Sequence, residues 1–438
     1  MAYDTAMHMG FLRSGFWDAL KVVLGAGVIA STLFCAGYAE PGEFLANWPK
    51  ETQPALRQAI RKGDSKAVSQ LILPNNKPAS FIAREDLPDA YYWLGVSHEQ
   101  NKQWGNAAQW FDKAATLDHP EAQYRLALLS LQGKLKDATV AARGQELLLQ
   151  AAKHNVRDAQ LQLAMAYEQG RWGFAKDLNQ AVNWYRKAAL NELPLAQYAL
   201  GFLYERGRGV TGDLPLAAHW YQRAAENGLT VAQYRLGLMY LDGKGLGKDA
   251  AKARNWLAKA GDKGHLNAQL QLGLMYEDGL LGNTDWDGNY QEALRWYKKA
   301  AAQGNSDGQM AVGTFYMMGW GVDQNFVEAY RWLQPSAKQG NEAAITWLKH
   351  LQGQMSKEEL AKAAQQLTGP RPVKTSKPNV PTAVTIKSAP VAKEMAMASA
   401  PKTTIIKPLA PPPKNEGWWF GWGKPVANKS QSSLQAAR

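Results

Sequence analysis

Side chains that could support acid–base, nucleophilic or metal chemistry occur in this sequence, but their spacing assembles no reaction centre. The seven histidines are scattered, and Cys35 is the only cysteine in 438 residues. The sequence has no H-E-x-x-H zinc motif and no G-x-S-x-G nucleophile motif. Gly247-Lys248 matches the end of a phosphate-binding loop, but Asp242 and Asp249 replace the first glycine and the final serine or threonine. The sequence therefore predicts no catalytic residue, cofactor or metal site.

The remaining candidate groups are better explained by structure. His119 and His265 both stand in the turn before a predicted helix, where a structural role is expected. Carboxylates are plentiful, yet no spacing singles out an acid–base pair, so they are expected on solvated helix faces.

A repeat of 36 to 40 residues organises the centre of the chain, and each copy begins with a small residue followed in six cases by glutamine. The opening residues are Ala122, Ala159, Ala196, Ala232, Ala268 and Gly308, and Ala344 opens a truncated copy. At about 100° per residue, the opening residue and the residues four and eight positions later share one helix face. The period predicts an array in which each unit packs only on its neighbours.

The copies also contain recurrent glycines between their two halves and a recurrent tryptophan in the second half. Tryptophan recurs there at Trp184, Trp220, Trp256, Trp296 and Trp332, and a small residue follows four positions later. We expect these rings to fill the space between helix layers. Glycine recurs between the two halves, as in Gly207-x-Gly209 and Gly243-x-Gly245, and is expected to end the first helix in a left-handed conformation.

The combined pattern, A-Q-x-x-L-G-x-x-Y-x-x-G-x-G-V followed by A-x-x-W-Y-x-x-A-A-x-x-G, resembles the Sel-one-like repeat family, a relative of tetratricopeptide proteins. The resemblance implies an all-α, right-handed superhelical solenoid of antiparallel helix pairs. It also implies an adaptor or scaffold role. Exported bacterial members assemble envelope complexes, regulate signalling or meet host cells, and some have been suspected of acting on cell-wall precursors.

Composition divides the chain into six parts. They are an export signal or membrane anchor (1–39), an N-terminal helical cap (40–89), a tetratricopeptide-like hairpin (90–121), six repeats (122–343), C-terminal capping helices (344–368) and a Pro/Lys-rich tail predicted to be disordered (369–438).

The N-terminal segment predicts an exported protein, in the periplasm or anchored facing it. An apolar run extends from Val22 to Phe34, and the small residues Gly37 and Ala39 after it would allow cleavage before Glu40. An uncleaved anchor is the alternative. The formal charge of +12 does not predict nucleic-acid binding, because the tail from Pro370 has 11 Lys/Arg and two Glu and so carries +9 of it.

A candidate binding face follows from the predicted first helices. Counting the opening residue as zero, positions −1, +2, +6, +9 and +10 fall in one arc of about 100°. This arc is apolar at +2 and +6 and acidic at its edge. Its apolar candidates are Tyr124, Tyr198, Phe202 and Tyr234, and its acidic candidates are Glu168, Glu205, Asp242 and Glu277. They predict a concave groove for a peptide with apolar anchors and basic flanks. Packing of +2 and +6 against neighbouring helices is the alternative.

The tail contains an aromatic cluster that the repeat does not explain, formed by Trp418, Trp419, Phe420 and Trp422 between Lys414 and Lys424. It could occupy the groove of its own array or of a second copy. Contact with an anionic membrane or cell-wall polymer, or a plain flexible tether, are the alternatives. The whole chain is therefore expected to be an exported, non-catalytic scaffold that binds protein partners. An enzyme acting on cell-wall precursors and a secreted host-interaction factor are the alternatives.

Overall fold

The computed structural model describes residues 49–50, 52–135, 138–281 and 286–368, and every regular element in them is helical. The predicted export signal and the tail with its aromatic cluster lie outside these ranges. The elements are α3 (Thr52–Lys62), α4 (Ser65–Ile72), η1 (Pro74–Asn76), η2 (Arg84–Asp86), α5 (Leu87–Gln100), α6 (Trp104–Ala115), α7 (Pro120–Leu131), α8 (Ala138–Ala142), α9 (Gly144–Lys153), α10 (Arg157–Gln169), α11 (Leu178–Leu190), α12 (Pro194–Arg206), α13 (Leu214–Glu226), α14 (Thr230–Asp242), α15 (Ala250–Asp262), α16 (Leu266–Glu277), α17 (Trp286–Ala302), α18 (Ser306–Met318), α19 (Phe326–Lys338), α20 (Glu342–Gln354) and α21 (Lys357–Thr368). In these ranges no helix is long and apolar enough to cross a membrane.

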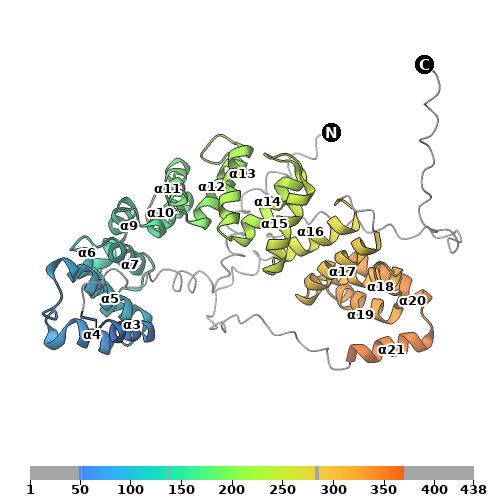
Figure 1. The fold of residues 1–438 in the computed structure, drawn as a ribbon, viewed down its shortest axis with the longest axis horizontal. Helices are drawn as coiled ribbons and strands as arrows, with labels where there is room; N and C mark the ends of the chain where they lie inside the picture. The colour runs from blue at the N-terminus through green and yellow to red at the C-terminus, as the bar shows by residue number, and fades with distance from the viewer. Residues whose placement is uncertain (1–48, 51, 136–137, 282–285, 369–438) are drawn as a thin grey trace, which may run out of the picture.

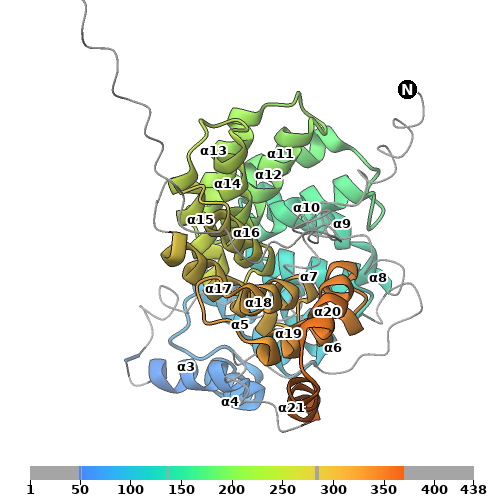
Figure 2. The same ribbon diagram turned by 90° about the vertical axis from the view of Figure 1, so that its right-hand side faces the viewer.

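Consecutive helices pair and stack into the expected all-α solenoid. In each unit a first helix packs against a second helix: α5 on α6, α7 on α9, α10 on α11, α12 on α13, α14 on α15, α16 on α17 and α18 on α19. Each second helix also packs against the next first helix. The array rises from α3 and α4, arches over α12 to α15 and descends to α21 (Figure 1). In the view turned by 90°, α3 and α4 at one end and α21 at the other all lie at the bottom of the molecule (Figure 2).

The predicted packing face forms the core. The opening alanines and the leucines four residues later are fully buried, as Ala196 and Leu200 show. From the second helices, Trp184, Trp220 and Trp296 are buried, whereas Trp256 and Trp332 are half-buried. The tyrosine after Trp184, Trp220 and Trp296 is more deeply buried than the tryptophan itself.

A buried glutamine, one residue after the opening residue, joins three helices. In α10, Gln160 Nε2 donates to the carbonyl of Ala152 in α9 (3.1 Å), and its Oε1 accepts from Asn191 Nδ2 at the end of α11 (3.0 Å). Gln197 repeats both bonds with Ala189 and Asn227. Since a buried amide loses free energy when unpaired, these bonds fix where one unit sits on the next.

Small residues five positions after the opening residue allow the two helices of a unit to approach closely. A Cβ at Gly201 would lie 2.9 Å from the ring of Tyr221, and one at Gly273 would overlap the ring of Tyr297. In α7 and α10 the same position is alanine, which also leaves room for a close approach.

Glycines in the connections have two separate functions. Gly207 and Gly243 end α12 and α14 in the predicted left-handed conformation, with φ of 61° and 73°. The second glycine of each connection, Gly209 or Gly245, also has positive φ and lies against the start of the preceding unit's second helix. The first glycine of the Gly-x-Gly pattern therefore ends a helix, and the second allows close packing against the preceding unit.

Both ends of the array are closed as the sequence indicates. Gly63 separates α3 from α4, and Asp64 caps α4 by accepting from the backbone of Ala67 at 2.9 Å. At the other end, Ser356 and Glu359 form a capping box, with reciprocal bonds of 2.9 and 3.1 Å.

Replacing Gly273 with alanine should destabilise the array by roughly 1–3 kcal/mol, because the added methyl group overlaps the ring of Tyr297 and forces helices apart. Gly247→Ala is the matched control, because a methyl group there would meet nothing within 4 Å and the φ of Gly247 is not positive. Urea denaturation followed by circular dichroism measures both variants. Equal transition midpoints for the two variants would contradict this account of the glycine.

Candidate functional site

The structure places most of the predicted position +2 side chains in the core. Tyr124 and Tyr198 are each 6 % exposed, and Tyr234 is half-buried and stacks on His265 at 4.4 Å. Packing against neighbouring helices, the alternative raised by the sequence, therefore describes position +2. These rings do not form an open groove wall.

Position +6 differs, because it leaves a line of half-buried apolar side chains along five consecutive first helices. These are Leu128, Met165, Phe202, Leu238 and Leu274. The line stops at α18, where Thr314 is buried and donates to carbonyls of its own helix. Leu128, Met165 and Phe202 pack onto the core, but Leu238 and Leu274 belong to no hydrophobic cluster of the described residues. Leu238 and Leu274 are thus the two half-buried side chains of the line that lie outside these clusters.

The predicted acidic edge separates into structural and exposed carboxylates. Glu168 is 2 % exposed and accepts from the Tyr185 hydroxyl at 2.8 Å. Glu205 and Glu277 accept equivalent bonds from Tyr221 (2.8 Å) and Tyr297 (2.6 Å). Asp242 is exposed and pairs with Lys244 at 2.8 Å. Three of the four predicted acidic residues therefore link the first helix to the second within a unit.

The sequence indicates these glutamate–tyrosine hydrogen bonds through two positions that change together, which counting positions in one helix does not detect. Where position +9 is glutamate in units 157–192, 194–229 and 266–305, the residue after the tryptophan is tyrosine. Where position +9 is Leu131, Leu241 or Met317, the corresponding second-helix residue is leucine. Glu99 is the exception, since its unit has Phe111 and its carboxylate lies 3.5 Å from Arg125. The two positions change together because a buried carboxylate requires a donor.

The charge of these glutamates is balanced to different extents. Glu205 accepts from Arg235 of the next first helix, with Nε at 3.1 Å from Oε2. Although burial acts to raise its pKa, this guanidinium and the Tyr221 hydroxyl together hold the pKa of Glu205 below its usual range. At Glu168 the nearest guanidinium is Arg208 at 3.5 Å, and burial raises the pKa of the carboxyl. Burial also raises the pKa of Glu277, which adjoins Asp278.

The histidines have the expected structural role. His119 and His265 are the N-cap residues of α7 and α16, and each ring accepts from a backbone N–H at 3.2 Å. Burial lowers the pKa of His265 to about 4, so this cap remains neutral at physiological pH. The described residues contain no group of three or more His, Cys, Asp or Glu side chains that could hold a metal ion.

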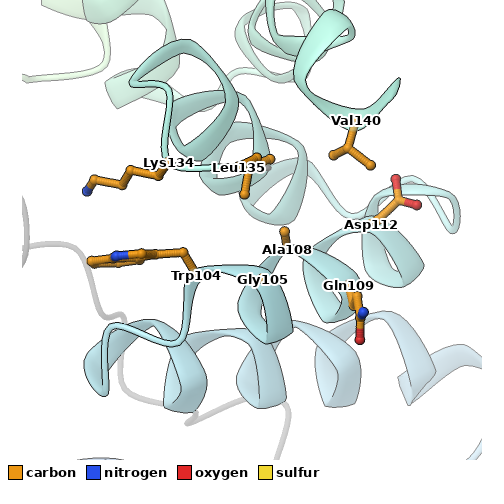
Figure 3. Close-up of a pocket in the computed structure, with 8 residues that line it drawn as sticks. All are labelled: Trp104, Gly105, Ala108, Gln109, Asp112, Lys134, Leu135 and Val140. Atoms are coloured by element: carbon orange, nitrogen blue, oxygen red, sulfur yellow. The ribbon is translucent and has the colours of Figure 1, made fainter. Parts of the chain in front are cut away.

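A cavity of about 570 Å³ lies between α6 and the connection that follows α7 (Figure 3). The Lys134 ammonium lies over the Trp104 ring, 4.2 Å from its centroid, and Asp112 lies at the opposite end, where Arg143 donates to it at 2.7 Å. The lining brings no nucleophile beside a base, so its geometry offers packing and charge contacts rather than a reaction centre.

Comparison with known proteins identifies the repeat. The Sel1 repeat profile matches residues 88–119, 120–156, 157–192, 194–229, 230–265, 266–305 and 306–341, more than half of the chain. It includes residues 88–119, which contain the hairpin with tetratricopeptide-like spacing.

Two solved structures and one further protein are similar. A protective antigen of uropathogenic Escherichia coli with an SLR fold is 29 % identical, with a TM-score of 0.57, covering 71 % of this chain and 70 % of that one. A Sel1 repeat protein from Oxalobacter formigenes is 28 % identical, with a TM-score of 0.47, covering 72 % and 94 %. Chitin synthase regulatory factor 3 of Schizosaccharomyces pombe is 30 % identical over 131 residues, which are 28 % of this chain and 14 % of that protein.

Two glutamate substitutions should show opposite pH dependence. The pKa of Glu205 is lowered on folding, so its stabilisation is present above the unfolded-state pKa and is lost as pH falls through the folded-state pKa. Glu205→Gln should therefore cost roughly 1–3 kcal/mol at neutral pH, and less in acid. The pKa of Glu168 is raised on folding, so its stabilisation is present at low pH and is lost as pH rises.

Glu168→Gln should accordingly become more favourable relative to the unmodified chain as pH rises through the folded-state pKa of Glu168. Urea denaturation of both variants at a series of pH values measures this. The same sign of pH dependence in the two variants would refute the assignment of Arg235 as the group that makes Glu205 different.

Proposed function

This chain belongs to the Sel1 repeat family, and we propose from that premise that it is a non-catalytic scaffold that binds a protein partner along its first helices. Sel1 repeat proteins generally act in protein–protein interactions. An array of this kind presents an extended surface in which successive units contribute equivalent side chains. The proposed surface is the concave side of the arch.

The observation that carries this proposal is the position +6 line. Its five apolar side chains stay half-buried in consecutive units, and three of them also pack onto the core. Leu238 and Leu274 in particular lie outside the hydrophobic clusters of the described residues. Partly exposed apolar residues aligned over several units are typical of a surface that buries a partner's apolar anchors.

Three carboxyl groups with shifted pKa values support binding over catalysis. Glu168, Glu205 and Glu277 hold pairs of helices together through tyrosine hydroxyls. Their environment is explained by the fold, so they do not require a substrate to account for it.

We also propose that the protein is exported and works in a bacterial cell envelope. The support is the apolar segment that ends near Glu40 in the sequence. If the segment is a cleaved signal, intact-mass measurement of the protein from its own cells should give an N-terminus at Glu40. A membrane-bound chain that retains residues 1–39 would indicate the anchor, and a full-length chain in the cytoplasmic fraction would contradict export.

Photo-crosslinking tests the proposed face. A photoreactive amino acid at Met165 or Leu238, both on the position +6 line, should give the same discrete adduct in the native cell. Asn255 is the control position, because it is exposed on the second helix α15. Adducts of equal yield from Asn255, or none from the two first-helix positions, would rule out binding along this line.

A further inference from the structure

The position +6 line acquires a distinct character at α14 and α16. One helical turn after Leu238 stands Asp242, and one turn after Leu274 stands Asp278, so each half-buried leucine has an exposed carboxylate on the same face. In α7, α10 and α12 the corresponding residue is Gln132, Gln169 or Arg206. We call Leu238, Asp242, Leu274, Glu277 and Asp278 the α14–α16 patch. It is the apolar and acidic portion of the line.

In the α14–α16 patch, Glu277 lacks the arginine that accompanies the glutamate at position +9 in other units, whereas Asp242 pairs with Lys244. Glu99, Glu168 and Glu205 each have an arginine within 4 Å, but among the described residues no lysine or arginine lies that close to Glu277 or Asp278. The reason for Glu277 is local: the next first helix has Ala311 where Arg235 stands beside Glu205. The last turn of α16 also contains no basic residue. A cation placed there would meet two carboxylates and the negative end of a helix.

The same chain contains a segment of complementary chemistry. Residues 414–424 place four aromatic side chains between Lys414 and Lys424. These residues lie outside the described ranges. Trp418 stands 50 positions after Thr368, where α21 ends. Fifty residues of flexible chain have a root-mean-square span of about 40 Å, and a Pro-rich chain extends further. Since packed helices lie about 10 Å apart and α21 packs on α19, this span covers the helices between α21 and α16.

We propose that residues 414–424 dock within the same molecule on the α14–α16 patch. The aromatic rings cover Leu238 and Leu274, and the flanking lysines approach Glu277 and Asp278. This proposal rests on the proposed function only because the α14–α16 patch is part of the same proposed binding face. Tethering gives the segment an effective concentration of about 1 mM, so a weak intrinsic affinity suffices for occupancy, and a partner of higher affinity can displace it. The tail then acts as a built-in competitor for the scaffold's binding face.

Covalent footprinting of the full chain tests the docking. Carbodiimide labelling should modify Asp278 at least about threefold faster when Trp418, Trp419, Phe420 and Trp422 are all replaced with alanine, because the cover is removed. Glu146 is an internal control, since it is exposed on the second helix α9 and its labelling should not change. An unchanged rate at Asp278 would overturn the proposal.

A reciprocal measurement follows the tail. Amine labelling of Lys424 should accelerate in Asp278→Arg and stay unchanged in Gln132→Arg, which alters an exposed residue at the same repeat position of α7. Equal acceleration in both variants would show a non-specific charge effect and overturn the assignment to this patch. Masking of Asp278 that weakens on tenfold dilution would assign the contact to a second copy and overturn intramolecular docking.

The outcome is separable from that of the proposed function. If Asp278 is not masked while the probe at Met165 still gives its adduct, only the tail proposal fails. If Asp278 is masked and no probe position crosslinks a partner, the tail proposal stands and partner binding along the line fails.

Discussion

The array depends on a buried amide that successive units use to position themselves on their neighbours. Gln160, Gln197, Gln233 and Gln269 each donate to a carbonyl near the end of the preceding second helix, at 2.8 to 3.2 Å. A side chain of this kind tolerates little displacement, because an unpaired buried amide costs about 1–3 kcal/mol. The bond therefore sets the step between units. Since each unit contacts only its neighbours, the repeated step determines the path of the whole arch.

Within that constraint, every unit after the first has one of two interiors, and the first unit combines Glu99 with Phe111. One pairs a glutamate late in the first helix with a tyrosine of the second, as in Glu168 with Tyr185. The other places aliphatic side chains at both positions, as with Leu241 and Leu257. Either combination leaves the step between units intact. In the mixed first unit no tyrosine faces Glu99, and Arg125 lies 3.5 Å from its carboxylate instead. The arginines that accompany some glutamates then set which units retain negative charge.

The proposed binding face uses positions that the core and the step between units leave partly exposed. The opening residue, the leucine four positions later and the second-helix aromatics form the core. The glutamine after the opening residue forms the hydrogen bond between units. Position +6 remains, and its residues at α14 and α16 are leucines outside the hydrophobic clusters of the described chain. The charge of Glu277 and Asp278, which no basic side chain of the described residues balances within 4 Å, adjoins these leucines. A protein with a rigid, self-supporting array can vary these few residues without disturbing its fold.

The sequence by itself determined the helix pairs, their stacking, the terminating glycines and the capping box at Ser356. All of these depend on local periodicity and on hydrogen bonds between residues a few positions apart. Only the tertiary structure decided where the predicted site residues lie. The helical wheel places Tyr198 and Glu205 on the same exposed arc as Phe202, yet Tyr198 is buried and Glu205 is held by Tyr221 and Arg235. Burial of a helix face depends on the residues that an adjacent helix or unit presents to it, some 16 to 30 positions away, and a wheel drawn for one helix contains no information about them.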